Sequence, residues 1–236
     1  MKTILLYKAN ERGSTKLDWL DSRHSFSFGQ YFNPNNTHFG ALRVLNDDIV
    51  QPGKGFGTHP HNNMEIISIA LEGALEHKDS MSSIQVIKKD DVQVMSAGTG
   101  ILHSEYNHSN EEIANFLQLW IFPDKKNVKP RYDQNSFPLS ERLDQLKIVV
   151  DGYKNSDALS INQNAKIILG NLSNDKDVNY TIKNGNGVYI FVIDGSIKIG
   201  EHKLEKRDAL SIEEVGIIKI SSKQTSNFLM VEVPTN

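Results

Sequence analysis

The sequence predicts an all-β protein made of two tandem antiparallel β-barrels of the jelly-roll type, with few short helices. Three observations predict this fold: short runs rich in β-branched and aromatic residues, turn signals between the runs, and little helical periodicity. The turn signals include Gly73, Gly152 and Gly195, each directly after an acidic residue. Strands of this spacing are typical of sandwiches and barrels. The runs are residues 66–71, 84–87, 92–95, 116–122, 147–150, 188–193, 217–220 and 228–233.

The other segments are interpreted around these strands. The best helical patterns are short and lie at residues 14–21 and 140–146. Residues 123–145 are polar and contain three prolines, so they are predicted to link two domains. We therefore expect an N-terminal domain over residues 1–133 and a C-terminal domain over residues 134–236.

A faint internal repeat supports two similar domains. In each half a strand ends in an acidic-glycine turn, at Gly73 and at Gly195, and a second strand follows. Farther on, Asp91 and Asp208 each precede another strand. Duplication of one small barrel explains both the repeat and the total length, and a chance likeness between two hairpins is the alternative.

Composition excludes several classes of function. The 236 residues include no cysteine, so disulfides, thiolate metal sites and cysteine nucleophiles are excluded, and any metal must be held by His, Asp or Glu. The net charge is −3, which argues against direct binding of nucleic acid or of an anionic membrane. No apolar stretch is long enough for a membrane span or, at the start of the chain, for a signal peptide. A cytoplasmic protein is expected.

The histidines are unevenly distributed. Seven of the eight lie before residue 110 and only His202 lies after it. Imidazole is the commonest metal ligand and general base, so the first half is expected to carry any chemistry. The C-terminal domain is expected to have no metal ligands, because the positions that correspond to the N-terminal ligands fall near Lys183 and Ile220.

Two i, i+2 pairs form the strongest candidate site. His59 and His61 follow a glycine-rich stretch, and alternation along a strand places both on one face. His103 and Glu105 have the same spacing on a second glycine-led segment. Together they offer three imidazoles and one carboxylate, a set that suits Fe(II), Ni(II), Co(II), Mn(II), Cu(II) or Zn(II). Ordinary surface histidines at hairpin ends are the alternative.

The spacing of these residues resembles the two motifs of the cupin family. Gly98 stands where the second motif usually has proline, and Gly73 closes the first motif one residue late. The matching residues are Gly53, His59, His61 and Glu65 in the first motif and Gly100, His103 and Asn107 in the second.

Within that superfamily the chain is similar to the pirin family. The likeness covers about residues 7–133, and it includes an N-terminal signature seen in bacterial, quercetinase-like members. The segments that carry it are residues 19–22, 24–28, 59–61, 71–73, 76–80, 92–98 and 100–105.

This resemblance implies a bicupin that holds one divalent transition metal, Fe(II) as first choice, in its N-terminal barrel only. It implies quercetin 2,3-dioxygenase activity, with a flavonol-like aromatic compound and dioxygen as substrates. The pirin pattern assigns the carboxylate ligand and the catalytic base to Glu105, whereas the general cupin pattern assigns the ligand to Glu65. Strand parity does not decide between them, and the pirin match is the more specific. Glu65 is then expected to line the cavity or to orient a ligand imidazole.

A second class of function stays open. The protein could be a metal-binding sensor or a protein-interaction module with incidental quercetinase activity, which would imply a protein partner. The remaining histidines receive ordinary interpretations: His24 and His38 are expected to be structural or solvent-facing, and His108 and His202 to be solvated. Nothing in its spacing makes His77 a ligand.

Overall fold

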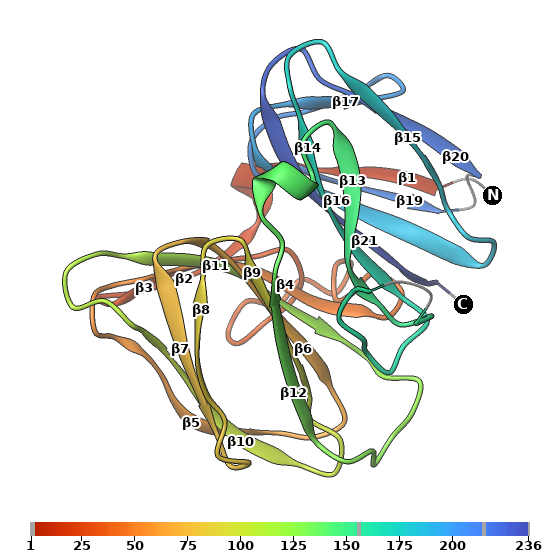
Figure 1. Cartoon of the computed structure of the whole chain (residues 1–236). Coiled ribbons are helices and arrows are strands. Elements are labelled where there is room, and N and C mark those ends of the chain that lie inside the picture. The colour runs from red at the N-terminus through yellow and green to blue at the C-terminus, as the bar shows by residue number, and fades with distance from the viewer. Residues whose placement is uncertain (1–2, 155–156, 214–215, 236) are drawn as a thin grey trace.

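The computed structural model describes residues 3–154, 157–213 and 216–235 and is almost entirely strand (Figure 1). Its helical structure in these ranges is two 3-10 turns, η1 (Ala9–Glu11) and η2 (Leu139–Glu141). The all-β prediction is therefore confirmed. No helix of the described part has the length and apolar character needed to cross a membrane.

The first barrel contains eleven antiparallel strands. They are β2 (Gly13–Leu17), β3 (Leu20–His24), β4 (Leu42–Val50), β5 (Gly55–His61), β6 (Glu65–Glu72), β7 (Ala74–Asp79), β8 (Ile84–Lys88), β9 (Asp91–Ser96), β10 (Ile101–Asn107), β11 (Ala114–Ile121) and β12 (Arg131–Ser136). A seven-stranded sheet has the order β12-β9-β6-β11-β4-β3-β2, and a four-stranded sheet has the order β5-β10-β7-β8.

The second barrel repeats this arrangement. Its strands are β1 (Thr3–Tyr7), β13 (Gln145–Asp151), β14 (Lys166–Leu172), β15 (Asp177–Thr181), β16 (Asn186–Asp194), β17 (Ile197–Ile199), β18 (His202–Leu204), β19 (Ala209–Glu213), β20 (Ile217–Ser221) and β21 (Ser226–Pro234). The sheet orders are β1-β19-β16-β21-β14-β13 and β15-β20-β17-β18. The order β9-β6-β11-β4-β3 thus recurs as β19-β16-β21-β14-β13, and the predicted bicupin fold is present.

The first strand of the chain lies in the second barrel. Strand β1 pairs with β19 along its whole length (Figure 1). Lys8, just after β1, forms an ion pair of 2.8 Å with Asp208. Residues 3–7, expected in the N-terminal domain, are therefore placed by strand pairing in the other sheet. Spacing along the chain could not show this, because the partner strand is some two hundred residues away.

The polar segment expected to be a linker also contains a strand. Strand β12 pairs with β9 from Arg131↔Ser96 to Ser136↔Asp91, so the prediction of a linker over residues 123–145 is wrong for this stretch. Prolines flank the strand at 130 and 138, where no ladder hydrogen bond is needed. The expected division at residue 133 falls within β12 and stays a prediction.

Both helical predictions are wrong. Residues 14–21 form most of a hairpin between β2 and β3, and in β3 the buried residues Leu20, Ser22 and His24 alternate with partly exposed ones, a period of two. In residues 140–146 the 3-10 turn η2 ends at Glu141 and β13 begins at Gln145.

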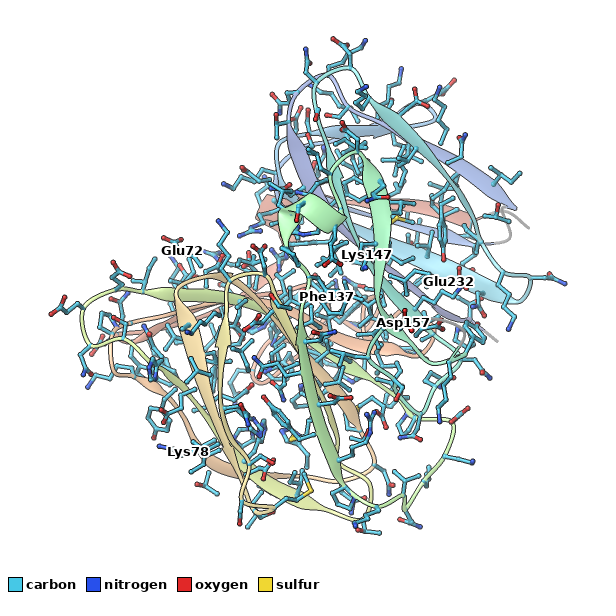
Figure 2. All side chains as sticks on the ribbon, viewed as in Figure 1. Glu72, Lys78, Phe137, Lys147, Asp157 and Glu232 are labelled. Atoms are coloured by element: carbon cyan, nitrogen blue, oxygen red, sulfur yellow. The ribbon has the colours of Figure 1, made fainter. Side chains whose placement is uncertain are left out.

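The two large sheets pack against each other and form the main core. On β4, β6 and β11 the outward-facing Leu45, Ile67 and Leu119 join a cluster with residues of the second barrel such as Tyr189 and Leu229. Phe137, buried in the same cluster, lies between the barrels (Figure 2). The opposite faces of these three strands therefore point into the first barrel.

Candidate metal centre

Two neighbouring strands bring three imidazoles together. His59 and His61 lie on β5, which pairs with β10 so that His59 stands opposite His103. The ring centroids are 4.4 Å apart for His59 and His103 and 4.9 Å apart for each of the other two pairs. One ligand nitrogen from each ring lies within 4.8 Å of the other two. This spacing allows all three rings to bind one ion.

Neighbouring groups determine which ring nitrogens are available. Nδ1 of His59 lies 2.7 Å from the Gly57 carbonyl oxygen and must donate to it, which leaves the lone pair on Nε2. Burial, helped by the nearby imidazoles, lowers the pKa of His61 to about 4 and that of His103 to about 3. Both rings are therefore neutral near pH 7, the form that binds metals.

His103 is held from behind by a second histidine. Its Nδ1 lies 3.4 Å from Nδ1 of His77, and Nε2 of His77 lies 3.1 Å from the Asp79 carboxylate. If His77 donates to Asp79, its Nδ1 accepts the proton of His103, and Nε2 of His103 keeps its lone pair. Tyr132 from β12 packs on the His77 ring at 4.7 Å.

Nε2 of His103 is the clearest sign that the site fits a metal. It is buried and has no hydrogen-bond partner in the described part of the chain. Buried polar atoms are rarely left unpaired, so such an atom calls for a ligand. Because it belongs to a neutral imidazole beside two others, the missing partner fits a divalent transition metal.

Glu105 lies next to this cluster rather than in the same compact group. A β-bulge between His103 and Glu105 shifts the register, so that Glu105 stands opposite Phe56. Its carboxylate accepts hydrogen bonds from Ser68 at 3.1 Å and from Gln118 at 2.8 Å. Ligand atoms of Glu105, His103 and His77 form a second group within 4.8 Å. One acceptor site on each Glu105 oxygen remains available.

The competing carboxylate, Glu65, faces away from the histidines. It lies on the face of β6 that points toward the second barrel, and accepts hydrogen bonds from Ser96 at 2.7 Å and Asn162 at 3.0 Å. Ser68, on the other face of β6, is the residue that reaches Glu105. The expectation that Glu65 lines the cavity or orients a ligand imidazole is therefore wrong, because the odd-numbered residues of β6 face the second barrel.

A cavity of about 350 Å³ opens beside His59 and Glu105. Its apolar wall consists of Leu20, Phe28, Phe56 and Trp120. Trp120 also packs edge-on against His61, with centroids 4.8 Å apart. A largely apolar cavity of this size, with a few polar groups converging on it, is typical of a small-molecule site.

Sequence reasoning missed two histidines of this region. His77 is fully buried behind His103, and His24 is buried and lines the cavity. Both belong to i, i+2 pairs like those of the metal-binding candidates: His77 shares a strand face with Asp79, and His24 with Ser22. His38 and His108 are exposed, as expected.

Comparisons with known proteins cover nearly the whole chain. The family model described as pirin matches residues 7–121, and that of the quercetinase C-terminal cupin domain matches residues 148–233. The quercetin 2,3-dioxygenase of Escherichia coli strain K12 is 39% identical over 98% of this chain and 99% of its own. A putative quercetin 2,3-dioxygenase of Zymomonas mobilis is 40% identical over 90% of this chain and 91% of its own.

Solved structures give the same result. The crystal structure of YhhW from Escherichia coli has a TM-score of 0.95 and 38% identity, and covers 99% of each chain. The structure of this bacterial pirin in complex with nickel(II) has a TM-score of 0.94, and covers 99% of this chain and 100% of its own.

Proposed function

The chain belongs to the pirin family, and from this membership we propose that it is a metal-dependent dioxygenase that opens the oxygen-containing ring of a flavonol such as quercetin. One observation carries the proposal: three imidazoles, one of them with a buried and unpaired nitrogen, converge beside an aromatic cavity that also contains a carboxylate. Metal, base and flat substrate would thus share one chamber.

His59, His61, His103 and Glu105 would hold one divalent cation. Fe(II) is our first choice, and Ni, Co, Mn, Cu or Zn would suit the same donors. The Escherichia coli pirin forms a complex with nickel(II), which supports binding of a divalent ion by this chain. When bound, the metal would supply Lewis acidity and a template for substrate and dioxygen.

Glu105 would act as the base. Its carboxylate is held by Ser68 and Gln118 and borders the cavity, so it can accept the proton of the flavonol 3-hydroxyl. Phe28, Phe56 and Trp120 would orient the flat ring system and exclude water. In the overall reaction both atoms of dioxygen enter the product, and one ring carbon leaves as carbon monoxide.

Oxygen uptake tests this function directly. Metal-loaded protein should consume quercetin and dioxygen together, and should do neither when metal or air is removed. Glu105→Gln should retain metal but lose about a hundredfold or more in turnover, since a positioned base contributes 10²–10⁴-fold. Glu76→Gln on the neighbouring strand β7, whose carboxylate faces Lys78 and His108, is the matched control.

Two results would contradict the proposal. Undiminished turnover by Glu105→Gln would show that Glu105 is not the base. Metal-loaded protein that consumes no oxygen with any flavonol would show that the chain lacks the proposed activity. A sensor or interaction module would then be the better explanation.

A further inference from the structure

A second polar group of residues lines the cavity on the seven-stranded sheet, across from β5. It comprises Thr15 on β2, Ser22 and His24 on β3, and Asn46 and Asp48 on β4. Ser22, His24, Asn46 and Asp48 are almost completely buried. Burial of polar side chains is unfavourable unless they have hydrogen-bond partners, so this arrangement at a cavity indicates a role other than packing.

Hydrogen bonds within the group fix the direction of each donor. Burial lowers the pKa of His24, so its ring is neutral near pH 7. Nδ1 of His24 donates to the Asn46 side-chain oxygen at 3.0 Å, and Nε2 therefore accepts the Thr15 hydroxyl at 2.9 Å. The Ser22 hydroxyl donates to one oxygen of Asp48.

Two polar atoms of the group are left over. The second carboxylate oxygen of Asp48 and the side-chain amide nitrogen of Asn46 form no hydrogen bond with the described residues. One is an acceptor and the other a donor, and they come from positions two apart on the same face of β4. A hydroxyl group, which both donates and accepts, matches this pair.

We propose that Asp48 and Asn46 bind a second hydroxyl group of a flat aromatic substrate whose first hydroxyl faces Glu105. The inference rests on the proposed function, and it names the feature that the substrate must carry: a hydroxyl remote from the reacting one. An aromatic ring can pack against the apolar wall of the cavity. A ring without a second hydroxyl would leave the buried Asp48 carboxyl without a hydrogen-bond partner. A substituent with a negative charge would be rejected by Asp48 and Glu105 together.

Tryptophan fluorescence offers a local test. The chain has two tryptophans; Trp120 lines the cavity, and Trp19 packs edge-on against the lining residue Phe56 at 5.2 Å. Metal-free protein is titrated with quercetin and with 3-hydroxyflavone, which retains only the reacting hydroxyl. At pH 8, above the pKa of Asp48, we expect quercetin to bind about tenfold more tightly or better, the effect of one hydrogen bond to a charged group.

Variants then test whether Asp48 causes the difference in affinity between the two flavonols. Asp48→Ala should reduce this difference to within about threefold. Asp48→Asn should retain an intermediate difference, because an amide can still pair with a hydroxyl. Asp21→Asn, on the outward face of β3 next to Ser22, is the matched control and should keep the full preference. Circular dichroism checks folding, and Asp48→Asn carries the test if Asp48→Ala does not fold.

The outcomes separate this inference from the proposed function. Equal affinity of the wild type for both flavonols, or an undiminished preference in the Asp48 variants, overturns the hydroxyl subsite. Selective binding that disappears with Asp48, in a protein that consumes no oxygen, supports the subsite and overturns the dioxygenase proposal.

Discussion

The two barrels have the same strand order but different interiors. In the first, β5 and β10 place His59 opposite His103. In the second, the corresponding strands β15 and β20 place Val178 opposite Ile220 and Tyr180 opposite Ile218, with both isoleucines buried. A shared arrangement of strands therefore carries imidazoles in one barrel and packed apolar side chains in the other.

One row of residues across the large sheets shows the same contrast. In the first barrel Asn46, Gln118 and Ser68 are cross-strand neighbours on β4, β11 and β6 and face inward. The equivalent row on β14, β21 and β16 is Ile168, Met230 and Ile190, all within the apolar core of that barrel. The apolar row is packed in the interior of the second barrel. The polar row contributes Asn46 and Gln118 to the lining of the cavity in the first barrel. Strand order thus determines the frame, and the inward side chains determine whether it can bind anything.

The largest expected effect is on metal loading. His103→Ala removes the buried imidazole of the three and should reduce bound metal from about one ion per chain to nearly none. His202→Ala removes the histidine of the second barrel, on β18, and should leave metal content unchanged. Elemental analysis of both purified variants measures the metal content. Equal metal contents would show that metal binding does not depend on the histidine cluster of the first barrel.

A smaller effect is expected at His77. Removing it takes away the group that orients His103, so His77→Ala should weaken metal affinity by about 10–100-fold, the usual effect of such supporting residues. His108→Ala, an exposed histidine beside Glu76, is the control. Competition with a chelator of known affinity reports the change. Unaltered affinity in His77→Ala would show that His103 needs no support.

The smallest expected effect is on the free energy of unfolding and comes from the buried carboxyl of Asp48. Burial raises the pKa of Asp48 from 3.8 to about 7. The folded state therefore holds the carboxyl proton of Asp48 more firmly than the unfolded state does. The contribution of Asp48 to the stability of the wild type falls as the pH rises from about 4 to about 7. Asp48→Asn imitates the protonated acid imperfectly, so we expect it to be more stable than wild type by about 1–2 kcal/mol at pH 8.

Denaturant titrations of the metal-free proteins measure this difference. The gain of Asp48→Asn should shrink by more than half at pH 5, where the folded wild type is already protonated at Asp48. A gain of equal size at both pH values would mean that Asp48 does not titrate near neutrality.

Much of this architecture was predictable from local patterns. Strands such as β6, β16 and β21 have apolar runs bounded by turns, and the i, i+2 pairs place His59 with His61 on one face. The same alternation in β3 was not predicted, because its buried face carries the polar residues Ser22 and His24. The resemblance to pirins supplied Glu105 as the preferred carboxylate, a choice that parity within the sequence left open.

The sequence alone determined what depends on neighbouring residues: the strands, the turns, the absence of cysteine and the two ligand pairs. Only the tertiary structure decided which face of β6 points inward, that β1 joins β19, and that His77 stands behind His103. These outcomes depend on the register between strands distant in the chain, and a shift of one residue would turn each side chain to the other face of its sheet.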